Sequence, residues 1–295
     1  MIAHVRTVYL GTSDFAVDVL RRLVDSDHRP ALVVTRPDRP SGRGRKLNAP
    51  PVACAARELG LELDQPGSVN SEEARERIAV AEPDAVLVCA FGALIGEPLL
   101  SSYDMLNVHP SLLPRWRGAA PVERAIEAGD AVTGVSIMRP TAELDAGPVY
   151  LAAEEAIGPE DSYDTLAARL ARLGGELLVQ ALDTGAQPGP QAAEGVTYAE
   201  KISAEDRRLE PSRPAVELER SVRALHPHIG AYLELGDGER LRVLRARAGE
   251  GRGGELTERD GRLFAGELEL LEVQSAGARP MDAAAWLRGH AARLG

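Results

Sequence analysis

Three polar side chains of this sequence could act together on a carbonyl group: Asn107, His109 and Asp145. A side-chain amide can donate a hydrogen bond to a carbonyl oxygen that becomes anionic during acyl transfer. An imidazole can act as a general acid or base near neutral pH, and a carboxylate can orient it or move protons through water. No nucleophilic serine or cysteine is evident beside them, so the set favours direct acyl transfer to an amine over a covalent enzyme intermediate.

The neighbouring residues indicate how a fold could present Asn107 and His109. Residues 105–108 form a short apolar run that breaks at Pro110, which predicts a strand end with both side chains on one side. The carboxyl ends of strands are where α/β sheets bind their ligands. By spacing alone, however, an Asn-x-His pair is more often a hydrogen-bonded turn, and Asp145 could equally cap a type I turn.

Metal chemistry is not expected from this sequence. The two histidines of His226-Pro227-His228 have no cysteine or carboxylate partner at a ligand spacing, so this segment is interpreted as a loop. Cys54 and Cys89 each lie in apolar surroundings without a CxxC or histidine-rich companion, which predicts two buried thiols.

Length and charge limit the possible classes of protein. A chain of 295 residues with 44% apolar residues is long enough for about two globular domains. Apolar runs stay well below the roughly 20 residues that span a bilayer, and the first residues lack a signal-peptide layout, so we expect a cytoplasmic protein. The net charge of −11 argues against indiscriminate nucleic-acid binding but permits a local basic patch that recognises one RNA.

The order of apolar segments predicts an α/β fold with a doubly wound, mostly parallel sheet, because strand-like runs alternate with helical stretches. We expect strands at 5–10, 31–34, 61–63, 85–89 and 105–108, with edge strands at 134–138 and 149–151. We expect a first helix from about Asp14 to Val24, with an N-cap in residues 11–14. Further helices are expected from Glu72 to Val80 and along the leucines at 166, 170, 173 and 177.

A second, smaller domain is predicted at the C-terminal end. Glycine and proline concentrate in residues 184–195, and we place a catalytic domain at 1–189, a linker at 190–205 and a second domain at 206–295. After a helix near 216–225, short alternating segments separated by glycine-rich turns are typical of a small β-barrel. From residue 206 onward 15 arginines balance 15 acidic residues, so the net charge lies in the first part of the chain.

Several segments, in a fixed order, resemble those of the formyltetrahydrofolate-dependent formyltransferases, and in particular the members that formylate methionyl-tRNA. The strongest match is the run from Asn107 to Pro121. The other matching segments are residues 11–15, 36–46, 90–94, 144–147 and 196–201. This resemblance implies a Rossmann-like catalytic domain, a C-terminal barrel of the OB type, and transfer of the formyl group of 10-formyltetrahydrofolate to the α-amino group of methionyl initiator tRNA for translation initiation.

The resemblance also assigns roles to individual residues. It implies that Asn107, His109 and Asp145 are the catalytic trio. It implies that the folate donor, the only cofactor expected, contacts Ser111, Leu112, Leu113 and Pro114, and that its pterin lies against Phe91, Gly92, Ala93, Leu94 and Ile95. The absence of a GxGxxG motif after the first strand agrees with this, because no dinucleotide pyrophosphate has to be bound.

The segment from Arg36 to Lys46 is rich in cations. Arg36, Arg39, Arg43, Arg45 and Lys46 accompany a single acidic residue, Asp38. Without the resemblance a solvated surface loop would be the preferred interpretation. The resemblance implies that this loop binds the acceptor-stem end of the initiator tRNA, where cations meet phosphates and single-stranded bases, and that Arg115 and Arg117 extend the basic track.

Departures from the family pattern and two alternative functions remain open. Glu143 replaces a usual glycine, Arg139-Pro140-Thr141 replaces a Met-containing segment, and His228-Ile229 replaces a typical Trp-Pro. The nearest alternative is a sugar-nucleotide N-formyltransferase, although a small sugar amine gives the basic loop no acceptor stem to bind. The other is a non-catalytic tRNA-binding protein, which the intact catalytic trio disfavours. We expect a monomer that associates with neither membrane nor metal.

Overall fold

The computed structural model describes residues 4–41, 46–236, 238–249 and 256–290. Its contacts divide the chain into two compact units, neither of which is continuous in sequence. Unit 1 comprises Met1–Gly118, Thr133–Glu155 and Ala167–Tyr198, and unit 2 comprises Ala119–Val132, Ala156–Leu166 and Ala199–Gly295. Within the described ranges, none of the helices is long and apolar enough to cross a membrane.

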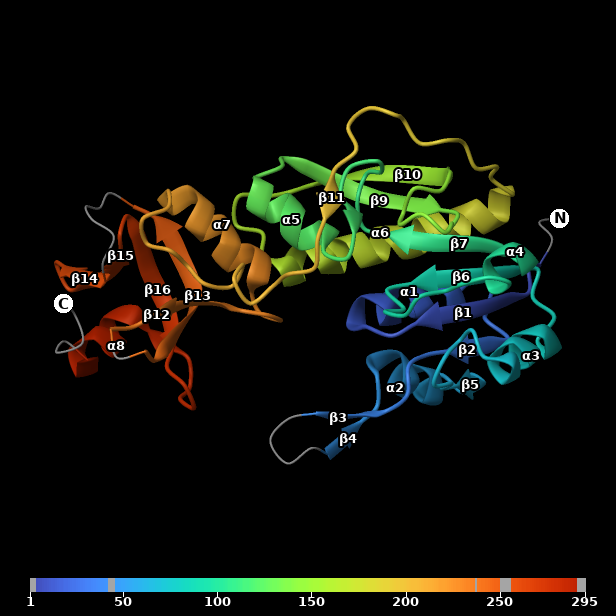
Figure 1. Cartoon of the computed structure of the whole chain (residues 1–295), viewed down its shortest axis with the longest axis horizontal. Coiled ribbons are helices and arrows are strands. Elements are labelled where there is room, and N and C mark those ends of the chain that lie inside the picture. Colours follow the sequence, from blue (N-terminus) through green and yellow to red (C-terminus); the bar gives the residue numbers. More distant parts are fainter. Residues whose placement is uncertain (1–3, 42–45, 237, 250–255, 291–295) are drawn as a thin grey trace. The chain divides into compact units, whose positions relative to one another are not determined.

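Unit 1 is built on a mixed sheet whose described strands run in the order β10-β9-β7-β6-β1-β2-β5 (Figure 1). These are β1 (Thr7–Gly11), β2 (Leu32–Val34), β5 (Leu63–Asp64), β6 (Ala85–Cys89), β7 (Asp104–His109), β9 (Val132–Met138) and β10 (Val149–Ala156). Neighbours from β5 to β7 pair in parallel, whereas β9 pairs antiparallel to β7. The mainly parallel sheet is therefore confirmed, with β9 and β10 at its edge as predicted.

Helices cover both faces of this sheet, as a doubly wound fold requires. They are α1 (Asp14–Val24), α2 (Pro51–Glu58), α3 (Glu72–Val80), α4 (Leu99–Ser102) and α6 (Tyr163–Thr184). Val8 and Leu10 of β1 share a core with Ile78 of α3 and Leu99 of α4. Tyr9 points to the other face, where its hydroxyl donates to the Ala16 carbonyl of α1 at 2.6 Å. Alternate residues of one strand thus bury against two helical layers.

Two short strand pairs lie outside the large sheet. One is β3 (Arg39–Ser41) with β4 (Lys46–Asn48), an antiparallel pair in the basic segment. The other is β8 (Arg117–Gly118) with β11 (Tyr198–Ala199). Sequence patterns did not predict these short elements, because two or three residues cannot show a period.

Unit 2 carries an antiparallel sheet with helices packed on it. Its strands run in the order β12-β13-β16-β15-β14, with β17 beside β16: β12 (Ala231–Glu234), β13 (Arg240–Ala248), β14 (Leu256–Arg259), β15 (Arg262–Ala265), β16 (Leu268–Gln274) and β17 (Met281–Asp282). Its helices are α5 (Pro121–Ala128), α7 (Ala215–Leu225) and α8 (Ala283–His290). Leu218 of α7, Val243 of β13 and Trp286 of α8 belong to one buried core.

Three predictions need correction or remain unconfirmed. In the described residues no pairing joins the edge strands β12 and β14, so the closed barrel is not confirmed. Cys54 is exposed, and only Cys89 is buried as expected. Ser13 occupies the N-cap of α1, but its side chain makes no capping hydrogen bond. Apolar neighbours in sequence did not bury Cys54, because its position falls on the outer side of α2.

The ion pair between Arg124 of α5 and Asp206 stabilises unit 2. A guanidinium nitrogen lies 3.0 Å from the carboxylate, and the Ser203 backbone N–H donates to it at 2.7 Å. The hydrogen bond from Arg124 lowers the pKa of Asp206 from 3.8 to about 2. Since the folded-state pKa is lowered, this stabilisation is present above the unfolded pKa and is lost as the pH falls through the folded value.

We expect Asp206→Asn to lower the free energy of unfolding by about 1 kcal/mol at pH 7, a value reduced for solvent exposure of the pair. The effect should shrink as the pH approaches 2, because the wild-type carboxylate is then protonated as well. Urea unfolding at both pH values measures it. Glu205→Gln, which removes the neighbouring exposed charge, should be nearly neutral, and an equal loss for Asp206→Asn at both pH values would contradict this account.

Candidate functional site

The site is formed at the carboxyl end of β7, where Asn107 and His109 extend the face that begins with Met105. Met105 belongs to the core under α3 and α4, and side chains two residues apart on a strand share a face. Opposite them on β9, Met138 pairs with Asn107 and Ser136 with His109. The Asn107 amide nitrogen donates to the Met138 thioether sulfur at 3.6 Å, a weak bond that leaves its second N–H available to a ligand.

His109 is buried and has one fixed hydrogen bond. Its Nε2 lies 2.9 Å from the carbonyl oxygen of Trp116. Since a carbonyl only accepts, Nε2 must carry the hydrogen in the neutral ring. Nδ1 is therefore the nitrogen without a hydrogen in the neutral ring, and a carboxylate oxygen, Asp145 Oδ2, lies 3.7 Å from it. That distance suits an ion pair when the ring is charged and exceeds a direct hydrogen bond.

The structure thus brings His109 and Asp145 together, as the sequence predicted. Asp145 lies in the loop between β9 and β10, with a backbone φ of +47° that places it in the left-handed region. Aspartate tolerates this conformation better than most residues. The Gly118 backbone N–H donates to Asp145 Oδ2 at 2.9 Å, which holds the carboxylate on the side that faces His109.

Gln191 holds the same loop from its backbone side. The Gln191 amide nitrogen donates to the carbonyls of Asp145 and Gly147, at 2.8 and 2.7 Å. The amide oxygen accepts from Arg117, with the guanidinium nitrogens at 2.8 and 3.1 Å. Arg117 is only 8% exposed, so the prediction that it extends a basic surface track is wrong. Its residue type suggested a surface cation, but its guanidinium is buried and bonds the partly buried Gln191.

Residues 111–114 form a tightly tied segment after β7. The Ser111 side chain is fully buried and its hydroxyl donates to the Arg115 carbonyl at 2.6 Å. The hydroxyl of Ser136 donates to the Ser111 carbonyl at 2.7 Å and accepts from the Leu113 backbone N–H at 3.1 Å. The Ser111 hydroxyl therefore shapes this segment from inside, while Leu112, Leu113 and Pro114 are partly exposed at its surface.

The segment from Phe91 to Ile95 follows β6. Phe91 is buried in the sheet core, and Ala93 and Ile95 pack against that core, whereas Leu94 is 84% exposed. Gly92 adopts a left-handed backbone with a φ of +70°. The Thr12 hydroxyl donates to the Phe91 carbonyl at 2.7 Å and thereby ties this segment to the end of β1.

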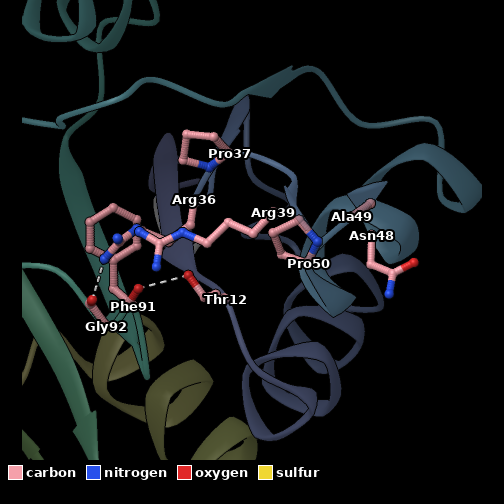
Figure 2. A pocket seen from close by; sticks show the side chains of 9 residues that line it. All are labelled: Thr12, Arg36, Pro37, Arg39, Asn48, Ala49, Pro50, Phe91 and Gly92. Carbon is pink, nitrogen blue, oxygen red and sulfur yellow. Dashed lines mark hydrogen bonds between the residues drawn. The ribbon is translucent and has the colours of Figure 1, made fainter. Parts of the chain in front are cut away.

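A pocket of about 330 Å³ opens between this segment and the base of the β3-β4 pair (Figure 2). The side chains that line it combine two cations, an amide, an aromatic ring and two proline rings: Thr12, Arg36, Pro37, Arg39, Asn48, Ala49, Pro50, Phe91 and Gly92. Arg36 donates to the Gly92 carbonyl, so it joins the two sides. Arg39 is exposed, while Arg43, Arg45 and the side chain of Lys46 lie outside the described residues.

The described part of the chain also holds two free cysteines, the exposed Cys54 and the buried Cys89. Burial raises the pKa of the Cys89 thiol to about 12, so it stays protonated and unreactive. No group of three or more His, Cys, Asp or Glu side chains is placed to hold a metal ion among the described residues. His228 stacks on Tyr163 and lies 2.9 Å from the Glu123 carboxylate.

Sequence reasoning missed the groups that position the trio. The Trp116 carbonyl and the Gly118 N–H are backbone groups, and no residue type identifies them in advance. Gln191 was placed in the predicted linker, because glycine and proline surround it. The unusual segment from Arg139 is anchored at its start, where the Arg139 guanidinium pairs with Asp104 and contacts the Tyr150 hydroxyl.

Comparison with known proteins gives consistent results. A family model described as "Formyl transferase" matches residues 5–182, and one described as "Formyl transferase, C-terminal domain" matches residues 201–291. The chain is 43% identical over 292 residues to a curated methionyl-tRNA formyltransferase of Paracoccus denitrificans, covering 97% of this chain and 98% of that protein.

Solved structures share the fold at low sequence identity. HypX from Aquifex aeolicus in complex with tetrahydrofolic acid superposes with a TM-score of 0.68 at 17% identity, over 97% of this chain and 47% of that one. An N-formyltransferase from Helicobacter canadensis, in complex with folinic acid and dTDP-3-aminofucose, gives 0.64 at 12% identity, over 92% and 99% of the two chains.

The loop that carries Asp145 should not tolerate a side chain at Gly147. A Cβ atom there would overlap the Arg139 carbonyl oxygen and press on the Thr141 methyl group. We expect Gly147→Ala to lower the free energy of unfolding by about 1–3 kcal/mol, the usual cost of overpacking. Urea unfolding measures it. Gly189→Ala is the matched control, because its added Cβ meets nothing within 4 Å, and equal stability of the two variants would contradict the argument.

Proposed function

The chain belongs to the formyl transferase family, and from this premise we propose that it transfers the formyl group of 10-formyltetrahydrofolate to the α-amino group of methionyl initiator tRNA. This is the formylation that precedes bacterial translation initiation. The observation that carries the proposal is the arrangement at the end of β7, where Asp145 faces Nδ1 of His109 at 3.7 Å and Asn107 extends the same strand face.

The chemistry needs no covalent enzyme intermediate. The neutral α-amine attacks the formyl carbon, a new C–N bond forms, and the formyl oxygen becomes anionic. The intermediate collapses as the bond from the formyl carbon to N10 of the folate breaks. The amine nitrogen loses one proton and N10 gains one, so the overall reaction is balanced. Each step asks the protein for charge stabilisation and proton transfer, which an amide, an imidazole and a carboxylate can supply.

The geometry supports a division of roles among the three residues. The available N–H of Asn107 donates to the developing oxyanion. His109 stabilises the same charge from its Nδ1 side, because its Nε2 hydrogen is already given to the Trp116 carbonyl. Asp145, whose carboxylate oxygen lies 3.7 Å from Nδ1 of His109, assists proton removal from the amine through a water molecule.

The folate donor is assigned to the segments beside the trio. Residues 111–114 follow directly on His109, and residues 91–95 follow the adjacent strand β6, so both lie at the carboxyl edge of the sheet. Leu112, Leu113 and Pro114 offer partly apolar contacts to the folate, and the 91–95 segment offers backbone groups to its pterin. Backbone amides and carbonyls suit a ring system with several donors and acceptors.

The acceptor tRNA is assigned to the basic segment and to the second part of the chain. Arg36 and Arg39 lie at the base of the β3-β4 pair, and Arg43, Arg45 and Lys46 continue the segment. We propose a catalytic domain at 1–189, a linker at 190–205 and an OB-like tRNA-binding domain at 206–295, in a cytoplasmic monomer. The open antiparallel sheet of unit 2 is compatible with an OB-type fold.

A sugar-nucleotide N-formyltransferase is the alternative that shares this chemistry. The fold does not separate the two, since structural relatives include an enzyme crystallised with an amino-sugar nucleotide. The extensive identity to a methionyl-tRNA formyltransferase and the cationic segment favour tRNA. A competition assay tests the choice: with a labelled folate donor, charged initiator tRNA and dTDP-3-aminofucose together, label should enter the tRNA.

We expect Asn107→Ala to lower kcat by roughly 100- to 1000-fold, the usual cost of removing one oxyanion donor. The measurement is single-turnover formylation of charged initiator tRNA at saturating folate donor. Gln180→Ala serves as the control, because Gln180 is an exposed amide of α6 and lies outside the trio. Wild-type protein without product would overturn the function, whereas an Asn107→Ala variant of full activity would overturn the site.

Arg39→Ala should weaken tRNA binding without affecting the donor. Arg39 is exposed at the base of the cationic segment, where its charge can meet a phosphate. We expect the KM for charged tRNA to rise roughly tenfold, as for loss of one charged contact, and its dependence on salt to become shallower. The KM for the folate should stay unchanged. Arg22→Ala removes an equally exposed charge from α1, and an identical effect of both variants would show a general loss of charge only.

A further inference from the structure

Two adjacent residues, Arg117 and Gly118, hold Asp145 in place, one through Gln191 and the other directly. Gly118 bonds Asp145 directly through its backbone N–H, at 2.9 Å from Oδ2. The residue before it, Arg117, reaches the same loop indirectly, because it bonds Gln191 and Gln191 bonds the carbonyl of Asp145. Adjacent residues of β8 therefore fix Asp145 at two points: its carboxylate directly, and its backbone carbonyl through Gln191.

The orientation of the Gln191 amide is fixed by its partners. The guanidinium of Arg117 only donates, so it requires the amide oxygen, and both its Nε and a terminal nitrogen contact Gln191 Oε1. This turns the NH₂ group towards the loop, where it bridges two carbonyls, of Asp145 and Gly147. One amide thus spans the turn in which Asp145 takes its left-handed conformation.

We propose that Gln191, oriented by Arg117, is a positioning residue for the reaction, which sets where the Asp145 carboxylate lies relative to His109. The inference rests on the proposed function and extends it to a residue outside the catalytic trio. Gln191 touches no reacting atom in this assignment. It acts through the Asp145 backbone, and a carboxylate displaced by about 1 Å can cost roughly 100-fold in rate.

Other groups near Arg117 do not explain this arrangement. Glu143 lies 3.6 Å from the Arg117 guanidinium, but its side chain is 74% exposed, so the pair contributes little. The bonds to Gln191 are shorter, at 2.8 and 3.1 Å, and join an almost fully buried Arg117 to a partly buried Gln191. The stronger interaction of this guanidinium is therefore the one that leads to Asp145.

Gln191→Glu is the sharpest variant. The carboxylate that it introduces keeps the shape of the side chain and pairs well with Arg117, but it can no longer donate to the two loop carbonyls. We expect kcat for formyl transfer to fall by about 10- to 100-fold, as for loss of supporting contacts, with the KM for the folate nearly unchanged. Gln187→Ala is the matched control, because the exposed Gln187 side chain bonds the nearby Gly185 carbonyl and no other group among the described residues, and it should retain full activity.

A double-mutant cycle separates positioning from general destabilisation. If Gln191 acts through Asp145, then Gln191→Glu should cause no further loss of kcat in an Asp145→Ala background. Full additivity of the two losses would overturn the proposal. Unfolding transitions of every variant identify any that fail to fold, and Gln191→Met then replaces Gln191→Glu as an uncharged side chain of similar length.

A measurement without substrate distinguishes failure of this inference from failure of the proposed function. The Gly118 amide proton reports its bond to Asp145 Oδ2, and its hydrogen exchange should be faster in Gln191→Glu than in wild type or Gln187→Ala. An active wild type with unchanged kcat and exchange in Gln191→Glu would overturn the positioning role alone. An inactive wild type would overturn the function, while faster exchange would still support the contact between Gln191 and the Asp145 loop.

Discussion

The site depends on holding the Asp145 carboxylate next to Nδ1 of the buried His109, whose other ring nitrogen already bonds the Trp116 carbonyl. His109 cannot turn without giving up its bond to the Trp116 carbonyl, so the position of Nδ1 is set by β7 and by residue 116. Asp145, which comes from a different part of the chain, then has to lie close to that nitrogen. A poorly solvated carboxylate is costly unless hydrogen bonds compensate it, and the Gly118 N–H and the nearby ring supply that compensation.

The antiparallel strand β9 allows Asp145 to reach His109. In a sheet that is otherwise parallel up to β7, its pairing sets Ser136 beside His109 and Met138 beside Asn107. The loop that follows β9 therefore starts next to β7, and Asp145 needs only a short return along the chain to reach His109. Ser136 has a second function, because its hydroxyl ties the segment after β7 to the same strand. The strand β9, between β10 and β7, thus organises both the carboxylate and the segment that we assign to the folate.

The sequence predicted the strands better than the contacts between them. Continuous apolar runs identified β1, β6 and β7, and a polar pair at the end of β7 indicated the site, because these signals are local. Gln191 could not be recognised, since its partners are two backbone carbonyls far away in sequence. Arg117 was misread for the same reason: arginine is usually exposed, and only the tertiary structure shows that this one is buried against an amide.

The loop from Arg139 to Gly147 explains why its unusual sequence is compatible with an intact site. Its start is fixed where Arg139 pairs with Asp104, and its end is fixed where Gln191 bonds the carbonyls of Asp145 and Gly147. Residues 141–144 between these anchors are exposed. The Glu143 side chain therefore lies at the surface, while its backbone carbonyl accepts from the Thr141 hydroxyl at 3.0 Å and from the Ala146 N–H at 3.4 Å. Of the residues that depart from the family pattern, Glu143 lies on the exposed part of the loop, whereas Arg139 is itself one of the two anchors.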